Sequence, residues 1–205
     1  GLASAAFGLL IVVLFHDSFW LLAGSFTGYL IVAPIVATGL YAVSRRLEQG
    51  QAAGLRDVFA VWRSQDPRLM HFGVLLAFAG TGWLVTSAAF VTSFTELPVH
   101  RPLDFLRHVV LARDNWLFEL WLALGGVMAA PIFASSAIAL PLLLDRRVSV
   151  LQAVITSWEA VLRNPQTLAL WAALIMGLTL LGLLSALLGL IVVMPVLGHA
   201  SWHAY

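Results

Sequence analysis

The stretch Trp116–Leu144, WLFELWLALGGVMAAPIFASSAIALPLLL, decides the fold class of this chain. It contains one charged residue, Glu119 near its start, and almost all its other side chains are apolar or small. A helix rises about 1.5 Å per residue, so roughly 20 such residues cross the hydrocarbon core of a bilayer, about 30 Å thick. The stretch is therefore predicted to be a membrane-spanning helix.

Four further apolar runs lie on either side of this stretch: Leu2–Phe15, Ser18–Val43, Leu69–Phe94 and Leu168–Leu197. The first run is short for a span, and residue 1 is Gly, so we expect the numbering to begin inside a longer chain. The last run holds Gly182, Ser185 and Gly189 near its middle, and we expect it to turn there and cross twice. Six spans are predicted in all.

The composition supports a membrane protein and excludes several other classes. Of the 205 residues, 61% are hydrophobic and 10% are charged, whereas soluble domains have about 25% charged residues. The formal net charge is +1, which is too small to attract nucleic acid, so no nucleic-acid partner is expected. The chain has no Cys, which excludes thiolate metal sites and Cys nucleophiles.

Two polar joints between the spans contain helical patterns of their own. Residues 55–64 and residues 148–163 each carry apolar side chains at helical spacing, with arginines close by. Such amphipathic helices suit the membrane interface, so we expect both segments to lie there. The polar joint of residues 95–115 is predicted to be an outer loop with a short helix at Leu103–Leu111.

The distribution of arginine predicts the orientation of the chain. All eleven basic residues are Arg, and eight of them lie in Ser44–Arg68 and Asp145–Gln166. The other three are Arg101, Arg107 and Arg113. Arg and Lys in short loops favour the cytoplasmic side, so the two Arg-rich joints are expected in the cytoplasm. With six spans, both termini lie there as well.

Two stretches of the sequence are alike, which indicates an internal repeat. One runs from Ala33-Pro34 to Asp66-Pro67 and the other from Ala130-Pro131 to Asn164-Pro165, and each includes an Arg pair and a Trp. A fainter third copy begins at Met194-Pro195. We expect one transmembrane domain over residues 1–205, built from three α-hairpins at about 1–43, 69–144 and 167–205.

The prolines of the repeat are predicted to kink their helices. Pro34, Pro131 and Pro195 each remove a backbone hydrogen bond. The favoured interpretation is a packing kink, and the alternative is a functional hinge of a transporter, in which repeats frame a site at mid-membrane.

Chemistry-bearing residues are scarce in the spans. The span interiors lack Asp, Glu, Lys, Arg and His, whereas ion- and proton-coupled transporters carry such groups in the membrane. Glu119 and His71 lie close to span ends and are interpreted as interfacial. No nucleophile–base set is visible, so no catalytic residue is expected.

His199 and His203 are the weak candidates for a metal site. They stand four positions apart and share a helix face, but no carboxylate lies near them in the sequence. Trp202 and Tyr205 beside them favour the membrane interface. A second polar set, interpreted as solvated, consists of His100, His108, Glu96, Asp104 and Asp114. No metal and no cofactor is expected at either place.

Small residues and interface-seeking residues complete the candidate sites. Gly24 and Gly28 have the four-residue spacing that permits close helix packing, so both are expected to face another helix. Six residues are predicted to anchor the chain at the interface: Arg45, Arg46, Arg146, Arg147, Trp158 and Trp202.

Three stretches resemble a known family: Ala33–Glu48, Asp145–Arg147 and Leu190–Tyr205. They are similar to a proteobacterial family of predicted integral membrane proteins catalogued as domain of unknown function 2189. Leu190–Tyr205 is the most specific part of the likeness. The resemblance implies a multi-pass helical protein of the bacterial inner membrane, and it carries over no catalytic residue.

The sequence favours a non-enzymatic protein that serves as an accessory or scaffold subunit of a larger inner-membrane complex, such as a respiratory one. The expected partners are membrane lipids and other membrane protein subunits. The alternative is a transporter or channel for a neutral or lipid-like molecule, motivated by the repeat and its prolines. An intramembrane enzyme ranks third, because no constellation for catalysis is visible.

Overall fold

Every regular element in the described part of the chain is a helix. The computed structural model describes residues 1–64, 66–112 and 116–205, with the side chains of residues 31 and 32 outside the description. The elements in chain order are α1 (Leu2–Phe15), α2 (Phe19–Glu48), α3 (Leu55–Arg63), α4 (Pro67–Phe94), α5 (Pro102–Phe105), the π-helix η1 (Leu106–Val110), α6 (Leu117–Ser136), α7 (Ala139–Asp145), α8 (Val150–Arg163), α9 (Pro165–Leu184) and α10 (Leu190–Ala204). The prediction of an all-α fold is confirmed.

Four helical segments are long and apolar enough to cross a membrane. They are α2, α4, the α6–α7 pair and α9, with 30, 28, 29 and 20 residues. Helices α1 and α10 are apolar too, but they have only 14 and 15 residues. The six predicted spans thus correspond to four segments of spanning length and two shorter apolar helices.

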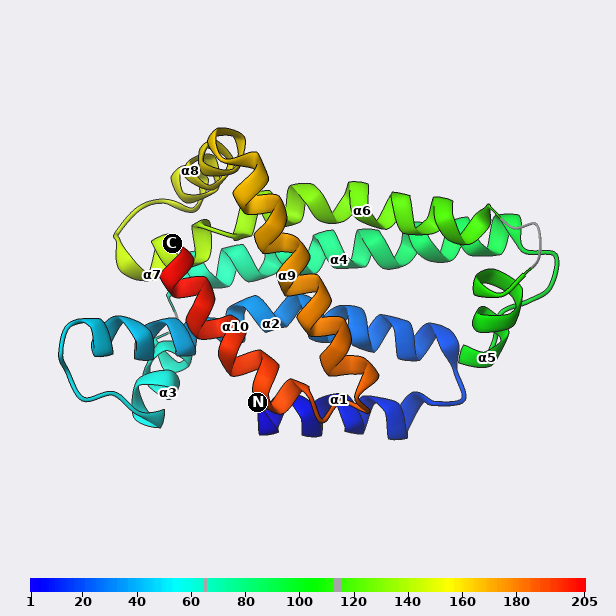
Figure 1. The fold of residues 1–205 in the computed structure, drawn as a ribbon, viewed down its shortest axis with the longest axis horizontal. Helices are drawn as coiled ribbons and strands as arrows, with labels where there is room; N and C mark the ends of the chain where they lie inside the picture. The colour runs from blue at the N-terminus through cyan, green and yellow to red at the C-terminus, as the bar shows by residue number, and fades with distance from the viewer. Residues whose placement is uncertain (65, 113–115) are drawn as a thin grey trace.

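The long helices run along the length of the molecule, and the last two cross them obliquely. Figure 1 shows α1, α2, α4 and α6 along the long axis, with α9 and α10 inclined to them. Helix α2 is central, because α1, α3, α4, α7 and α10 all pack against it. Helix α9 packs mainly against α10 and α8, so most of its surface is left uncovered by the chain.

The two Arg-rich joints meet at one end of the molecule, which we call the arginine-bearing end. Helices α3, α7 and α8 lie there with the C-terminus, whereas α5 lies at the opposite end (Figure 1). The bounds of α3 and α8 match the predicted amphipathic segments 55–64 and 148–163 closely. Helices α4 and α9 begin at Pro67 and Pro165, where the fixed φ of Pro suits a first helical turn.

The two amphipathic helices α3 and α8 dock on the helices that precede them in a related way. Trp158 Nε1 of α8 donates a hydrogen bond to Ser135 Oγ of α6 at 2.9 Å. On α3, Trp62 Nε1 lies 3.3 Å from the position that a Cβ on Gly39 of α2 would occupy. In both copies of the repeat, the Trp of the interfacial helix therefore turns its indole nitrogen toward the span that precedes it. Gly39 lets α3 approach α2 closely.

The stretch Trp116–Leu144, predicted as a single span, is interrupted between α6 and α7. The interruption lies at Ala137 and Ile138, where the backbone N–H of Ile138 bonds to a side chain outside its own helix. Ser157 of α8 is fully buried, and its Oγ accepts the N–H of Ile138 at 3.1 Å. The stretch still forms one candidate membrane span of 29 residues, and a side chain from the following helix stabilises the interruption within it.

The last apolar run turns at residues 185–189, as predicted from its small residues. Ser185 Oγ accepts a hydrogen bond from the N–H of Gly189 at 2.8 Å and donates one to the carbonyl of Gly182 at 2.9 Å. A Cβ on Gly189 would lie 2.9 Å from Gly182 Cα. Glycine at both positions therefore allows α10 to fold back directly against the end of α9.

The other predicted backbone features have mixed outcomes. Pro34, Pro131 and Pro195 lie inside α2, α6 and α10, and the kinks expected at them stay predictions. The loop between α4 and α6 packs onto the bundle through Phe19, whose ring stacks on Phe105 with centroids 4.6 Å apart. Residues 113–115 of this loop, including Arg113 and Asp114 of the sequence predictions, lie outside the described residues.

The buried core forms three clusters along the bundle. The cluster at the arginine-bearing end joins α2, α4, α7, α8 and α10, and it includes Tyr41, Phe72, Leu140, Leu143 and Trp202. The second lies at the opposite end and includes Val91, Val99, Val109 and Leu117. The third joins α1 to the α9–α10 turn through Ala5, Leu187 and Leu190. The first cluster holds the end of α10 against α2.

Candidate functional site

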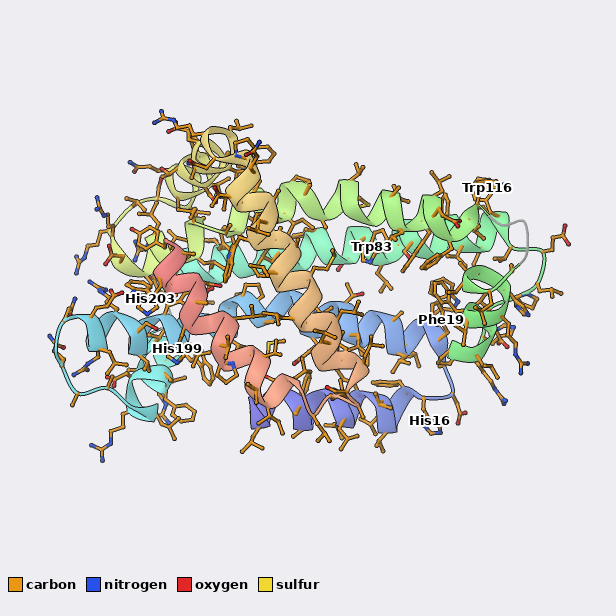
Figure 2. The ribbon with its side chains drawn as sticks, in the orientation of Figure 1. His16, Phe19, Trp83, Trp116, His199 and His203 are labelled. Atoms are coloured by element: carbon orange, nitrogen blue, oxygen red, sulfur yellow. The ribbon has the colours of Figure 1, made fainter. Side chains whose placement is uncertain are left out.

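The arginine-bearing end contains a polar cluster drawn from three helices. Helix α2 contributes its last turn, α7 its last residue and α10 its C-terminal end, and they meet because α2 packs against both other helices. Figure 2 shows His199 and His203 at this end, with Phe19 and Trp116 at the opposite one. The members of the polar cluster are Ser44, Arg45, Glu48, Asp145, His199, Trp202, His203 and Tyr205.

Glu48 ties the C-terminal helix to α2. Its Oε2 accepts a hydrogen bond from Trp202 Nε1 at 2.9 Å, and its Oε1 lies 2.9 Å from His203 Nδ1. One turn earlier, the buried Ser44 has its Oγ 2.6 Å from His199 Nδ1. The carboxylate that the sequence does not place near these histidines is thus supplied by α2, more than 150 positions away.

The two histidines face different partners on α2. In residues 1–64, 66–112 and 116–205, no group of three or more His, Asp or Glu side chains is placed to hold a metal ion. The geometry instead lets each imidazole act as a hydrogen-bonding or ionic contact between α10 and α2. The expectation that no metal binds at His199 and His203 stays a prediction.

Arg45 joins the polar cluster to the end of α7. One guanidinium nitrogen donates to the carbonyl of Leu144 at 3.0 Å, and Nε lies 3.3 Å from Asp145 Oδ1. The Tyr205 hydroxyl donates to Asp145 Oδ2 at 3.4 Å. Burial, and then the charge of Asp145, raises the pKa of Tyr205.

A cavity of about 280 Å³ lies between these groups. It is lined by Arg45, Glu48, Gln49, Asp145, Trp202, His203 and Tyr205. Both carboxylates in its wall already have internal partners. The arrangement therefore serves first to hold three helix ends together.

Arg68 also joins separate segments at this end, whereas in the sequence it is only one of the charges of an Arg-rich joint. It pairs with Asp66 at 2.6 Å and donates to the carbonyls of Arg146 and Val148 at 2.8 and 3.2 Å. The hydrogen bond from the Arg68 side chain holds the pKa of Asp66 below its usual range. The start of α4 is thereby tied to the joint between α7 and α8, and no local sequence signal marks this contact.

Three of the four arginines predicted as interface anchors have internal carboxylate partners. Arg45 and Arg146 both lie within ion-pair distance of Asp145, at 3.3 and 3.7 Å. Arg46 pairs with Asp57 of α3 at 2.5 Å. Among the described residues, Arg147 makes no ion pair and is exposed. Of the four, Arg147 is therefore the one whose guanidinium is not already paired with a carboxylate of the described chain.

The two tryptophans predicted as anchors differ in how much of each side chain is exposed. Trp158 is 38% exposed, and its role as an interface anchor stays a prediction. Trp202 is only 6% exposed and packs beside Tyr41, with ring centroids 6.4 Å apart. The anchor role predicted for Trp202 is wrong in this respect, because the packing of α10 on α2 buries it.

The predicted glycine pair lies on two different surfaces. A Cβ on Gly24 would lie 3.1 Å from Leu84 of α4, so α2 and α4 approach each other there. Among the described residues, nothing lies within 4 Å of a Cβ on Gly28. The prediction that Gly28 faces another helix is therefore wrong within this chain, since α2 exposes that position.

Comparison with known proteins identifies the family. No curated protein and no solved structure matches the chain. A family model described as "Predicted integral membrane protein (DUF2189)" matches residues 21–145. The matched region runs from α2 to the end of α7. It does not include Leu190–Tyr205, which is the most specific part of the sequence resemblance to the family. Because the match covers more than half of the chain, this protein belongs to the DUF2189 family of predicted integral membrane proteins.

Proposed function

We propose that the protein is a non-enzymatic, multi-pass protein of the bacterial inner membrane that acts as an accessory or scaffold subunit of a larger complex, such as a respiratory one. Helix α9 carries this proposal. Among its residues only Gly182 is buried, and its main packing partners are α10 and α8. A span left this open offers a long surface to another membrane protein.

The uncovered helix also has the residue pattern of a helix–helix contact. Ala169, Ala173 and Gly177 follow one another at four-residue spacing, which lets two backbones approach closely in a membrane. Among the described residues, nothing lies within 4 Å of a Cβ on Gly177. The row is therefore unused by the packing described within this chain.

Two observations bear on the choice between this function and transport. The apolar runs lack ionisable residues in their interiors, which argues against ion- or proton-coupled transport but not against uncoupled passage of a neutral molecule. Of the two cavities described, the one of about 280 Å³ lies at the C-terminal ends of α2, α7 and α10, and the one of about 250 Å³ lies between the α6–α7 break and the first half of α9. Their position supports contacts at one face of the membrane more than passage through it.

The proposal includes six spans with both termini in the cytoplasm. Eight arginines in the joints at the arginine-bearing end support a cytoplasmic location for that end. Helices α1 and α10 have lengths of about 21–23 Å at about 1.5 Å per residue. A bilayer accommodates such short helices by local thinning or by the flanking residues.

Replacing Gly177 by Leu is expected to release the chain from its complex. A misfit of about 1–3 kcal/mol in a packed contact weakens association by roughly 5- to 150-fold. The measurement is the set of subunits that co-purify with the tagged chain from native membranes, identified and quantified by mass spectrometry.

The matched control is Gly82→Leu on α4, where a Cβ also meets nothing within 4 Å among the described residues. This variant should retain the same subunits as the unmodified chain. An unchanged complex in Gly177→Leu, or saturable movement of a neutral solute by the purified monomer in liposomes, would reject the scaffold function.

A further inference from the structure

The interfacial helices α3 and α8 each present a row of uncovered apolar side chains. On α3 the row is Leu55, Phe59 and Trp62, all exposed. On α8 it is Leu151, Ile155, Trp158 and Leu162, again all exposed. The first three residues of each row have the same spacing, so the row belongs to the repeat. Val58 on α3 and Ser157 on α8, which lie beside these rows on the same helices, are buried against the spans.

Free guanidinium groups accompany both rows. The ion pairs described above occupy Arg45, Arg46, Arg68 and Arg146. Among the described residues, Arg56, Arg63 and Arg147 make no ion pair, and all three are exposed. Arg163 reaches only Glu159 of its own helix, at 3.9 Å. At the arginine-bearing end, the described arginines without an ion pair are therefore those on or next to α3 and α8.

We propose that α3 and α8 form a binding surface for anionic phospholipids of the leaflet at the arginine-bearing end. The apolar rows insert at the boundary between headgroups and acyl chains, and the guanidinium forks pair with phosphate oxygens. Charge complementarity selects the lipid, because Ser44–Arg68 and Asp145–Gln166 together hold eight arginines and only five carboxylates. This surface does not depend on the scaffold role or on α9.

The test measures lipid selectivity on the full chain in vesicles that mix phosphatidylglycerol with phosphatidylcholine. One of the two lipids carries brominated acyl chains, which quench nearby Trp fluorescence. Each protein is compared with its W62F counterpart, so that the difference reports Trp62 on α3 alone. In the unmodified chain, Trp62 should be quenched more strongly by brominated phosphatidylglycerol than by brominated phosphatidylcholine.

The variant R56Q/R63Q removes two exposed charges beside Trp62 without removing a described contact. In this variant the preference of Trp62 for phosphatidylglycerol should fall toward equality, by roughly five-fold for each guanidinium removed. Salt at about 1 M should lower the preference of the unmodified chain in the same way, because the Debye length is then about 3 Å. The matched control R101Q/R107Q removes two exposed charges at the opposite end and should leave the preference of Trp62 unchanged.

Three results would overturn the proposal: equal quenching by both lipids in the unmodified chain, an unchanged preference in R56Q/R63Q, or an equal loss in R101Q/R107Q. If R56Q/R63Q keeps its lipid preference but loses a co-purifying protein, the surface is a protein interface and the lipid assignment is wrong.

Discussion

Replacing Gly189 by Val is expected to lower the free energy of unfolding of the chain in detergent by about 1–3 kcal/mol, the usual cost of overpacking. A Cβ at this position would lie 2.5 Å from Ser185 Oγ and 2.9 Å from Gly182 Cα. Gly182 Cα is backbone, so no side-chain rotation can relieve the contact. Helices α9 and α10 must separate, and the hydrogen bond from the Gly189 N–H to Ser185 lengthens with them.

The matched control for this change is Gly177→Val, which introduces the same side chain into α9. Among the described residues, nothing lies within 4 Å of a Cβ on Gly177, so the monomer should keep its stability. The measurement is thermal unfolding in one detergent, where a chain of this size shifts by roughly 2–4 °C per kcal/mol. Equal melting temperatures for both variants would show that α10 does not fold back on α9 as described.

Replacing Ser157 by Val is expected to destabilise the chain by a similar or larger amount. The change leaves the N–H of Ile138 without its acceptor, at a cost of about 1–3 kcal/mol for a buried group. It also adds a carbon to a site that is 0% exposed, which brings a further penalty from overpacking. Because Ser157 joins α8 to the break between α6 and α7, the docking of α8 should weaken first.

Hydrogen exchange of the α8 backbone amides measures this effect, alongside the melting temperature. Thr156→Val is the matched control, since Thr156 is exposed and its hydroxyl bonds only to Gln152 of its own helix. Exchange in α8 should rise in Ser157→Val and stay unchanged in Thr156→Val. Equal exchange in all three proteins would mean that Ser157 does not seal the break.

The features that local chemistry determines could be predicted from the sequence. The apolar runs predict helices because a backbone in hydrocarbon must satisfy its own hydrogen bonds. Helical spacing predicts α3 and α8 almost to the residue, and the Pro residues at 67 and 165 mark the starts of α4 and α9. Each of these signals acts within a few positions along the chain.

The polar cluster and the α6–α7 break could not be predicted, because their partners are far apart in the sequence. Glu48 meets Trp202 only after α10 has packed on α2. Ala137 and Ile138 are not helix breakers, and the acceptor that stabilises the break comes from Ser157. Gly28 has the spacing of a packing residue, but the rotation of α2 exposes it. These outcomes depend on tertiary packing that periodicity does not specify.

The cytoplasmic location of the arginine-bearing end is the central claim, since the proposed inner-membrane topology depends on it. The chain has no Cys, so single cysteines can be introduced at Gln51, next to α3, and at Leu97, in the loop that follows α4. A thiol reagent that cannot cross the inner membrane should label Leu97→Cys in intact cells. It should label Gln51→Cys only after permeabilisation. Labelling of Gln51→Cys in intact cells would contradict the proposed orientation.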